Sequence, residues 1–260
     1  MYFAGIDLGS TMTKVVIIDK NEKICSRVVA PTGAEQESLA KKVMGEALKQ
    51  ANLSFEELSY IIATGYGRVN IPFADRQITE LTCHTKGVTS LFPAVRIAID
   101  IGGQDSKGLK IKEGKLIDFA MNDKCAAGTG RFLEVTAQAL GLKVEDLGSI
   151  SLKSTNKIKI SSTCTLFAQQ EVISSISEGM PLEDIIAGLH DALISRVVRM
   201  IKRLKLEPEI VFTGGVAKNV GVVKALKENL GMDVLVPKDP LLSGALGAAL
   251  LGKELTLTPK

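Results

Sequence analysis

The sequence has no tryptophan and few aromatic residues, with 8 Phe and 3 Tyr among 260 residues. This leaves little surface for stacking on nucleic-acid bases, and a formal net charge of +3 is too small for a nucleic-acid footprint. No apolar run reaches the roughly 18 residues of a membrane span, and the first residues lack the basic segment of a secretory signal. We therefore expect a cytoplasmic protein that binds neither nucleic acid nor membrane.

Two common nucleotide motifs are also missing. The sequence contains no G-x-x-x-x-G-K-[ST] and no strand-linked G-x-G-x-x-G, which argues against a P-loop and against a dinucleotide fold. The sequence does have 24 glycines, 45% hydrophobic and 23% charged residues, which is the composition of an ordinary globular protein rather than a disordered one.

The sequence contains an internal duplication of a short hairpin. Residues 3–18 read FAGIDLGSTMTKVVII and residues 96–111 read RIAIDIGGQDSKGLKI. In each copy an apolar strand ends at an Asp, a turn of small and polar residues follows, and a second strand carries a Lys at the same spacing. The matched residues are Asp7 and Asp100, Gly9 and Gly102, and Lys14 and Lys107. We therefore predict two similar lobes, each with its own sheet, facing one another across a ligand-binding cleft.

The two matched turns have the chemistry of a magnesium and phosphate site. Asp is a poor strand residue, so a carboxylate at the same point of both copies, Asp7 and Asp100, indicates a task such as holding Mg²⁺ through water. Backbone N–H groups and hydroxyls of the turns that follow can point at phosphate oxygens. The plain alternative is that both are hairpin turns closed by Asp and Gly, and the repetition makes that alternative weaker.

A third glycine turn follows a predicted strand at residues 209–213. Gly214 and Gly215 allow a ligand to approach the backbone closely, and the apolar residues from Val216 onward recur at helical spacing. A helix that begins at a ligand favours an anion or a nucleotide. Residues 243–250 predict a helix of small residues, for which tight helix packing and a binding role are equally good interpretations.

In their order these segments resemble the signatures of the actin, sugar-kinase and heat-shock-chaperone ATPase superfamily, which are two phosphate hairpins, an adenosine turn and two connecting helices. The resemblance spans essentially the whole chain and implies ATP as the nucleotide. The implied fold class is α/β, a duplicated two-lobed actin-like (ribonuclease H-like) ATPase fold with a nucleotide cleft between the lobes. Residues 1–94 would form the first lobe, to which the C-terminal helix returns, and residues 95–260 the second, with the adenosine-binding and cysteine-bearing segments.

The four cysteines, Cys25, Cys83, Cys125 and Cys164, include no C-x-x-C pair, so spacing alone predicts no metal site within one chain. Cys125 precedes a predicted helix at residues 132–140, and Cys164 directly precedes one at residues 166–176. The positive end of a helix dipole favours a thiolate or an anionic iron–sulfur cluster. Two such thiols per chain would complete a four-thiolate cubane, or a zinc site, in a symmetric dimer. The alternative is that both are ordinary buried thiols.

Seven segments together are similar to the activators of 2-hydroxyacyl-CoA dehydratases: GIDLGST, ATGYGR, IDIGGQD, NDKCAAGTGRFLEV, SSTCT, FTGGVAKN and SGALGAAL. That family belongs to a wider group with the ATPase subunits of benzoyl-CoA reductases and the reductases of double-cubane-cluster proteins. The resemblance implies a homodimer that holds one [4Fe-4S] cluster between its subunits, with Cys125 and Cys164 of each chain as the metal ligands. It implies no ligand role for Cys25 or Cys83.

The resemblance implies ATP-driven transfer of one electron. The cluster would take an electron from a ferredoxin or flavodoxin and, as ATP is hydrolysed, deliver it to a 2-hydroxyacyl-CoA dehydratase or a related double-cubane-cluster protein. For one electron, about 59 mV corresponds to about 1.4 kcal/mol, so an uphill transfer of a few hundred millivolts needs several kcal/mol, which ATP can supply. The alternatives are a small-molecule kinase of the same superfamily without a cluster, and a regulatory or chaperone-like ATPase.

The residue roles follow from the same resemblance. As catalytic residues we expect Asp7 and Asp100 to hold Mg²⁺ through water, and Gln104 or Asp105 to orient the attacking water. The hairpins would sense the γ-phosphate, and the helices near the two cysteines would shift in response. The residues expected around ATP are Ser10, Thr11, Met12, Thr13, Lys14, Gly102, Gly103, Gln104, Gly214, Gly215, Val216 and Asn219.

Overall fold

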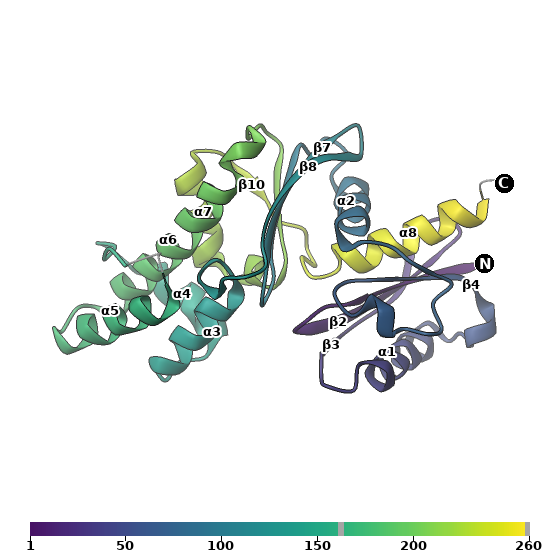
Figure 1. The fold of residues 1–260 in the computed structure, drawn as a ribbon, viewed down its shortest axis with the longest axis horizontal. Helices are drawn as coiled ribbons and strands as arrows, with labels where there is room; N and C mark the ends of the chain where they lie inside the picture. Colours follow the sequence, from purple (N-terminus) through teal and green to yellow (C-terminus); the bar gives the residue numbers. More distant parts are fainter. Residues whose placement is uncertain (161–163, 258–260) are drawn as a thin grey trace. The chain divides into compact units, whose positions relative to one another are not determined.

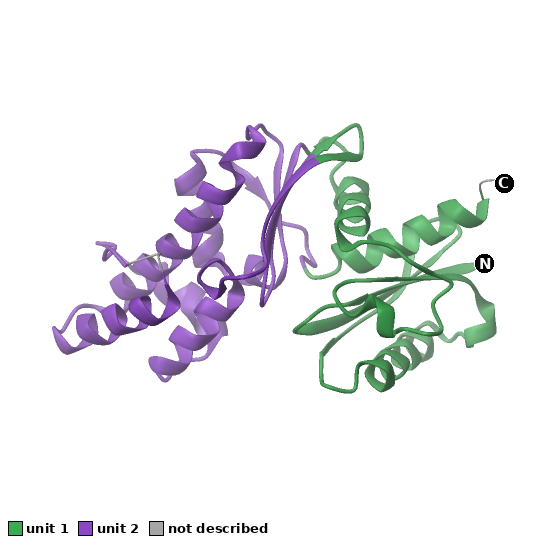
Figure 2. Cartoon of the chain, viewed as in Figure 1, with its two compact units in different colours: residues 1–95, 111–117, 241–260 green, residues 96–110, 118–240 purple. Residues whose placement is uncertain are grey.

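The structure, a computed structural model that describes residues 1–160 and 164–257, divides into two compact units (Figures 1 and 2). Unit 1 comprises Met1–Val95, Ile111–Ile117 and Leu241–Lys260, and unit 2 comprises Arg96–Lys110 and Asp118–Pro240. There are two five-stranded sheets, ordered β3-β2-β1-β4-β5 and β10-β9-β6-β7-β8. Helices pack against both sheets, which makes the protein an α/β protein (Figure 1).

The first sheet and its helices come mainly from the N-terminal part of the chain, and the last helix completes them. The elements are β1 (Tyr2–Leu8), β2 (Met12–Asp19), β3 (Ile24–Pro31), α1 (Gln36–Ala51), η1 (Phe55–Glu57), β4 (Leu58–Thr64), η2 (Arg68–Asn70), β5 (Arg76–Gln77), α2 (Glu80–Leu91) and α8 (Ser243–Leu257).

The core of unit 1 has two layers, because successive strand residues point to opposite faces of the sheet. Ile6 and Leu8 of β1 pack in one cluster with Met44 of α1. Phe3, of opposite parity, packs in a second cluster with Ala245 of α8. The sheet of unit 1 therefore lies between α1 and α8.

The second sheet and the remaining helices follow. The elements are β6 (Ile97–Ile101), β7 (Ser106–Lys112), β8 (Lys115–Asn122), η3 (Ala126–Gly128), α3 (Gly130–Ala139), η4 (Val144–Asp146), α4 (Leu147–Ser151), α5 (Thr165–Ser177), α6 (Leu182–Ile201), η5 (Lys202–Leu204), β9 (Ile210–Thr213), η6 (Gly215–Lys218), α7 (Val220–Leu230) and β10 (Val234–Leu235). The helices predicted at residues 132–140, 166–176 and 243–250 are confirmed as α3, α5 and α8.

The two sheets repeat one register around their aspartates. The strand partners of Asp7 are Lys14 and Thr64, and those of Asp100 are Lys107 and Thr213. In both sheets the Lys strand runs antiparallel to the Asp strand and the Thr strand runs parallel to it. The duplication that the sequence predicted is thus confirmed at the level of strand pairing, and it extends to a third strand in each sheet.

The small residues of α8 serve close packing. A Cβ atom at Gly247 would collide with the backbone carbonyl of Cys83 on α2, so α8 approaches α2 at this point without an intervening side chain. Of the two interpretations of this helix, tight packing is therefore the one that observed contacts support. No helix within residues 1–160 and 164–257 combines the length and the apolar character needed to cross a bilayer.

Candidate functional site

The first hairpin places an ion pair at the end of β1. Lys14 Nζ lies 3.1 Å from Asp7 Oδ2, with the two side chains 13% and 15% exposed. The turn is closed by a hydrogen bond from Gly9 N to Met12 O (3.1 Å). Because partial burial strengthens a charge pair, Lys14 holds the Asp7 carboxylate in place at the turn.

The side chains of this turn differ in how far they are available to a ligand. Ser10 is exposed, and Thr11 and Met12 are half-buried. Thr13, which we expected among the phosphate contacts, is fully buried, and its hydroxyl bonds to Thr32 Oγ1 (2.9 Å). The Thr13 hydroxyl thus links β2 to the chain after β3.

The second hairpin holds its aspartate differently. Thr213 Oγ1 donates to Asp100 Oδ1 (3.0 Å). Lys107 Nζ, only 8% exposed, lies 2.6 Å from Asp105 Oδ2 and 3.8 Å from Asp100 Oδ2. Lys107 is therefore shared between two carboxylates, and Asp105, a candidate for orienting water, already has a strong partner. Gln104 is exposed at the tip of this turn.

The third turn begins with Gly214 in the left-handed region, at φ 88°, and Gly214 N donates to Pro240 O (2.9 Å). Asn219, expected to contact adenosine, caps α7: its Oδ1 accepts from Gly221 N (3.0 Å) and Val222 N (3.1 Å). Its Nδ2 lies 3.2 Å from His190 Nε2. The Asn219 side chain is therefore engaged on three sides within the protein.

His190 is buried on α6, and burial lowers its pKa to about 3 because the cation would lose its hydration. The ring is therefore neutral. Its Nε2 accepts from Asn219, which puts the proton on Nδ1. The interaction joins α6 to the start of α7.

The second hairpin is bonded to the segment that follows Cys125. The N–H groups of Gly130 and Arg131, at the start of α3, donate to the carbonyls of Gly102 and Gly103, each at 2.8 Å. A Cβ atom at Gly130 would lie 2.9 Å from Gly102 O and 3.1 Å from Val216 Cγ2. The second hairpin, the third turn and the start of α3 thus meet at Gly130.

Cys125 is held through its backbone. Asn122 Nδ2 donates to Cys125 O (2.8 Å), and Cys125 N donates to Asn122 Oδ1 (3.2 Å). Residues 126–128 form the short 3₁₀ turn η3 directly after Cys125, and α3 begins after Thr129, two residues before the helix start that the sequence predicted. The Thr129 hydroxyl bonds to Ala126 O (2.9 Å), which closes that turn.

Cys164 is the N-cap residue of α5, and its carbonyl accepts from Ala168 N (3.0 Å). The first three residues of the SSTCT segment, 161–163, lie outside the described part of the chain. Next to Cys164, the side chains of Leu166 and Phe167 are 70% and 64% exposed.

Cys125 and Cys164 have the donor chemistry of a thiolate metal site. Cys125 and Cys164 are half-buried free thiols of unit 2, and each directly precedes a helical element, η3 or α5. Within residues 1–160 and 164–257, no group of three or more His, Cys, Asp or Glu side chains could hold a metal ion. A four-thiolate site built on these two cysteines would need two further thiols from a second copy of the chain.

The remaining cysteines are poor ligands. Cys83 is fully buried, and burial raises its pKa to about 12. The pKa of Cys25 is also raised, first by desolvation and then by the nearby Asp19 carboxylate. Burial therefore favours the protonated form of both thiols.

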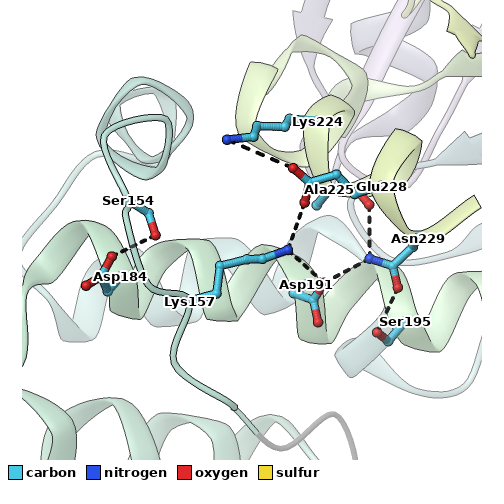
Figure 3. Close-up of polar contacts among 9 residues, drawn as sticks. All are labelled: Ser154, Lys157, Asp184, Asp191, Ser195, Lys224, Ala225, Glu228 and Asn229. Carbon is cyan, nitrogen blue, oxygen red and sulfur yellow. Dashed lines mark hydrogen bonds and ion pairs between the residues drawn. The ribbon is translucent and has the colours of Figure 1, made fainter. Parts of the chain in front are cut away.

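A polar network that the sequence did not reveal fixes the segment ahead of Cys164 (Figure 3). Asp184, at the start of α6, accepts from Ser154 Oγ (2.7 Å), the bond drawn in Figure 3. It also accepts from the backbone N–H groups of Thr155 and Asn156 (3.0 Å each). The Asn156 and Ser154 donors lower the pKa of the Asp184 carboxyl because they stabilise its charged form. Residues 154–156 are thus fastened to α6.

A second, separate set of polar contacts begins at the next residue and joins this segment to α6 and α7. Lys157 Nζ lies 2.7 Å from Glu228 Oε2 and 3.7 Å from Asp191 Oδ1. Asn229 Nδ2 donates to Asp191 Oδ1 (2.9 Å), and Ser195 Oγ donates to Asn229 Oδ1 (3.1 Å). Partners so distant in the sequence carry no local pattern, which is why no motif indicated them.

Comparison with known proteins gives one family for nearly the whole chain. Residues 4–252 match the model of the BadF/BadG/BcrA/BcrD ATPase family. The (R)-2-hydroxyglutaryl-CoA dehydratase activating ATPase of Acidaminococcus fermentans is 44% identical over 251 residues, which are 96% of this chain and 96% of that protein.

Solved structures agree with this family and with the fold. The activator of the 2-hydroxyisocaproyl-CoA dehydratase from Clostridium difficile, solved with bound ADPNP, has a TM-score of 0.93 at 45% identity, covering 98% of this chain and 95% of that one. A ROK family glucokinase from Streptomyces griseus has a TM-score of 0.61 at 13% identity, covering 98% and 100% of the two chains, which shows the fold alone. The expected duplicated actin-like α/β fold is confirmed.

Proposed function

The chain belongs to the BadF/BadG/BcrA/BcrD ATPase family, and from that membership we propose that it is an ATP-dependent one-electron transfer protein. In the proposed reaction one electron comes from a ferredoxin or flavodoxin. Hydrolysis of ATP to ADP and phosphate drives its delivery to a 2-hydroxyacyl-CoA dehydratase or a related double-cubane-cluster protein. The activator names of the relatives support this class of acceptor.

The proposed ATP contacts are described for each unit separately. In unit 1, Ser10, Thr11 and the Lys14–Asp7 pair would meet phosphate and Mg²⁺. In unit 2, Asp100 and the Gly102–Gln104 turn would do the same, and Gly214–Val216 would approach the nucleoside. Both carboxylates are already oriented by a partner within the protein, which supports a role as outer-sphere Mg²⁺ ligands. Gln104 is exposed at its turn and suits water positioning better than Asp105, which pairs with Lys107.

The observation that carries the proposal is the pair of hydrogen bonds from Gly130 and Arg131 to the Gly102 and Gly103 carbonyls. They join the proposed phosphate turn to the segment that follows Cys125. A change at this turn on loss of the γ-phosphate would therefore be transmitted to α3 and η3 without an intermediate element. A kinase that acts on a small molecule has no need for such a link between its phosphate turn and a cysteine segment.

Cys125 and Cys164 are the residues that would hold one [4Fe-4S] cluster per homodimer, two from each chain. When bound, the cluster would supply a centre that takes up and releases single electrons. Neighbouring groups would assist both thiols. Asn122 fixes the backbone of Cys125, and the N-terminus of α5 favours negative charge at Cys164. The exposed Leu166 and Phe167 beside Cys164 give a second copy an apolar surface to cover.

The first experiment is anaerobic purification with iron and sulfide analysis, an absorption spectrum and a measurement of subunit number. We expect a brown dimer with about four irons per two chains. Cys125→Ser and Cys164→Ser should each abolish the colour, and Cys25→Ser, a matched control outside the site, should retain it. A colourless dimer loaded with zinc, or a metal-free protein that phosphorylates a small molecule, would contradict the proposal and favour the corresponding alternative.

The second experiment tests the coupling to ATP. The chemically reduced protein is mixed with a purified 2-hydroxyacyl-CoA dehydratase and Mg²⁺ together with ATP, ADP or ADPNP. We expect oxidation of the activator, followed by its absorbance, with ATP only. Equal oxidation with all three nucleotides would show that hydrolysis does not drive the transfer.

A further inference from the structure

The segment ATGYGR, at residues 63–68, has no part in the function described above, yet it repeats the third turn. Both follow the strand that runs parallel to the Asp strand, and both begin with a Thr and a Gly in matching register. Gly65 has φ 87° and Gly214 has φ 88°. L-residues with a side chain rarely adopt this conformation, so the same special backbone occurs at the same place in each sheet.

The two glycines also meet equivalent atoms. A Cβ atom at Gly65 would collide with Asp7 Oδ1 and with the carbonyl of Leu8, the residue after the aspartate. A Cβ atom at Gly214 would meet Asp100 Oδ1 at 2.9 Å and the carbonyl of Ile101, again the residue after the aspartate. Residues 65–68 therefore lie against the first hairpin as the third turn lies against the second.

The two turns differ in charge. In the matched order Arg68 corresponds to Ala217, so unit 1 has a cation where unit 2 has a methyl group. Arg68 is half-buried, and its Nη1 donates to Gly65 O (3.0 Å), which keeps the guanidinium at the turn. Among residues 1–160 and 164–257 no carboxylate forms a salt bridge with Arg68, whereas Lys14 is neutralised by Asp7. The Arg68 and Asp7 charges both act on the buried Cys83 thiol, with opposite effects on its pKa.

We propose that Arg68 contacts the terminal phosphate of ATP at the first hairpin and so makes this turn selective for ATP over ADP. The inference rests on the proposed function, in which the first hairpin binds phosphate. A guanidinium has five N–H donors in a planar fork, and one is used by Gly65, so donors remain for a bidentate contact with phosphate. Because Asp7 and Lys14 cancel one another, Arg68 is the cation at this hairpin whose charge is available to a polyphosphate.

The test compares the affinities of Mg²⁺–ADP and Mg²⁺–ADPNP by calorimetry for the unaltered protein, Arg68→Ala and Arg68→Lys. A hydrogen bond to a charged group predicts that Arg68→Ala weakens ADPNP binding about 10- to 100-fold and leaves ADP binding nearly unchanged. Arg68→Lys, which keeps the charge and loses the fork, should lie between the two. Arg76→Ala, which removes an exposed arginine of β5, is the matched control and should change neither affinity.

The ratio of the two affinities separates a phosphate contact from a structural role. If Arg68 only closes its turn through Gly65, its removal weakens the binding of ADP and ADPNP equally. That result overturns the inference about Arg68, and the proposal that the protein is an ATPase still stands. Unchanged affinities for both nucleotides overturn it as well. If the unaltered protein binds neither nucleotide, the proposed function itself fails. Should Arg68→Ala not fold, Arg68→Lys and Arg68→Gln decide the question by the same ratio.

Discussion

The backbone N–H of Gly130 donates to the carbonyl oxygen of Gly102 over 2.8 Å, and this bond joins the helix that follows Cys125 to the turn that follows Asp100. The neighbouring bond from Arg131 to Gly103 has the same length. Two adjacent bonds fix the direction of α3 relative to the turn as well as its distance. A turn that changes with the nucleotide would therefore reorient the start of α3.

Gly130→Ala tests how tightly this contact is made. The added methyl would lie 2.9 Å from Gly102 O and 3.1 Å from Val216 Cγ2, so the turn must shift. We expect a loss of about 1–3 kcal/mol in unfolding free energy and weaker nucleotide binding, with iron content unchanged. Calorimetry and urea denaturation measure these effects. Gly45→Ala, in open space on α1, is the control and should stabilise by up to about 1 kcal/mol. Nucleotide affinity unaffected by Gly130→Ala would mean that the turn does not bind the nucleotide.

Asp184 and Lys157 allow a comparison between two neighbouring sets of polar contacts on α6 (Figure 3). Asp184→Ala removes the acceptor of three donors at residues 154–156, whereas Lys157→Ala removes ion pairs whose side chains are 40–45% exposed. Exposed pairs contribute about 0–1 kcal/mol. We therefore expect Asp184→Ala to lower the urea midpoint more than Lys157→Ala and to speed hydrogen exchange at the Thr155 and Asn156 amides. Equal effects of the two variants would contradict a dominant role for Asp184.

The sequence predicted what depends on local pattern and repetition. The two hairpins, the Asp–Lys registers and the helices near the two cysteines all follow from strand alternation, turn residues and helical spacing within short windows. The placement of Thr213 beside Asp100 could not be predicted in this way, because β9 joins the sheet from a distant part of the chain. The similarity of the turns that begin at Gly65 and Gly214 could not be predicted either, because the two segments share only a Thr and a Gly, which is too little to recognise before the strand register is known.

Two of the predicted site residues, Asn219 and Thr13, have structural roles that the sequence interpretation did not assign to them. Asn219, for which we predict a contact with adenosine, also caps α7 and contacts His190, and the adenosine contact stays a prediction. An Asn directly before an apolar helical segment is a capping signal, so the sequence did contain this information. Thr13 carries no comparable signal: alternation along β2 indicates only that it shares a face with Val15, two residues on. The bond to Thr32 depends on the pairing of β2 with β3.

His190 predicts an acid-sensitive core. Its folded pKa, lowered to about 3 by burial, lies below the unfolded value near 6.5. Between these values the unfolded state binds more protons, so stability is present above about pH 6.5 and falls as the pH drops, by at most about 1.4 kcal/mol per pH unit. His190→Gln should flatten this dependence between pH 6.5 and 4, as measured by urea denaturation. His84→Gln leaves His190 in place, so this control variant should keep the pH dependence of stability. An unchanged slope in His190→Gln would show that another group controls the acid response.

The matched threonines Thr213 and Thr64 give the sharpest test of the duplication, because the same substitution should have different effects in the two sheets. Thr213 Oγ1 bonds to Asp100 Oδ1 (3.0 Å), so Thr213→Val removes a donor from a buried charge and should cost about 1–3 kcal/mol of unfolding free energy. Thr64 is equally buried, but its hydroxyl has no hydrogen-bond partner within the described residues. Thr64→Val should therefore be neutral or slightly stabilising.

Urea denaturation without nucleotide measures the unfolding free energy of both variants. The affinity for Mg²⁺–ADP then shows whether Asp100 and Asp7 differ in their dependence on the neighbouring threonine. Thr213→Val should weaken Mg²⁺–ADP binding because Asp100 loses the partner that orients it, whereas Asp7 keeps Lys14 in Thr64→Val and binding should persist. Equal losses of stability in the two variants would mean that the bond from Thr213 to Asp100 contributes nothing measurable to stability. The two aspartates would then be held alike, and the difference in their partners would have no energetic consequence.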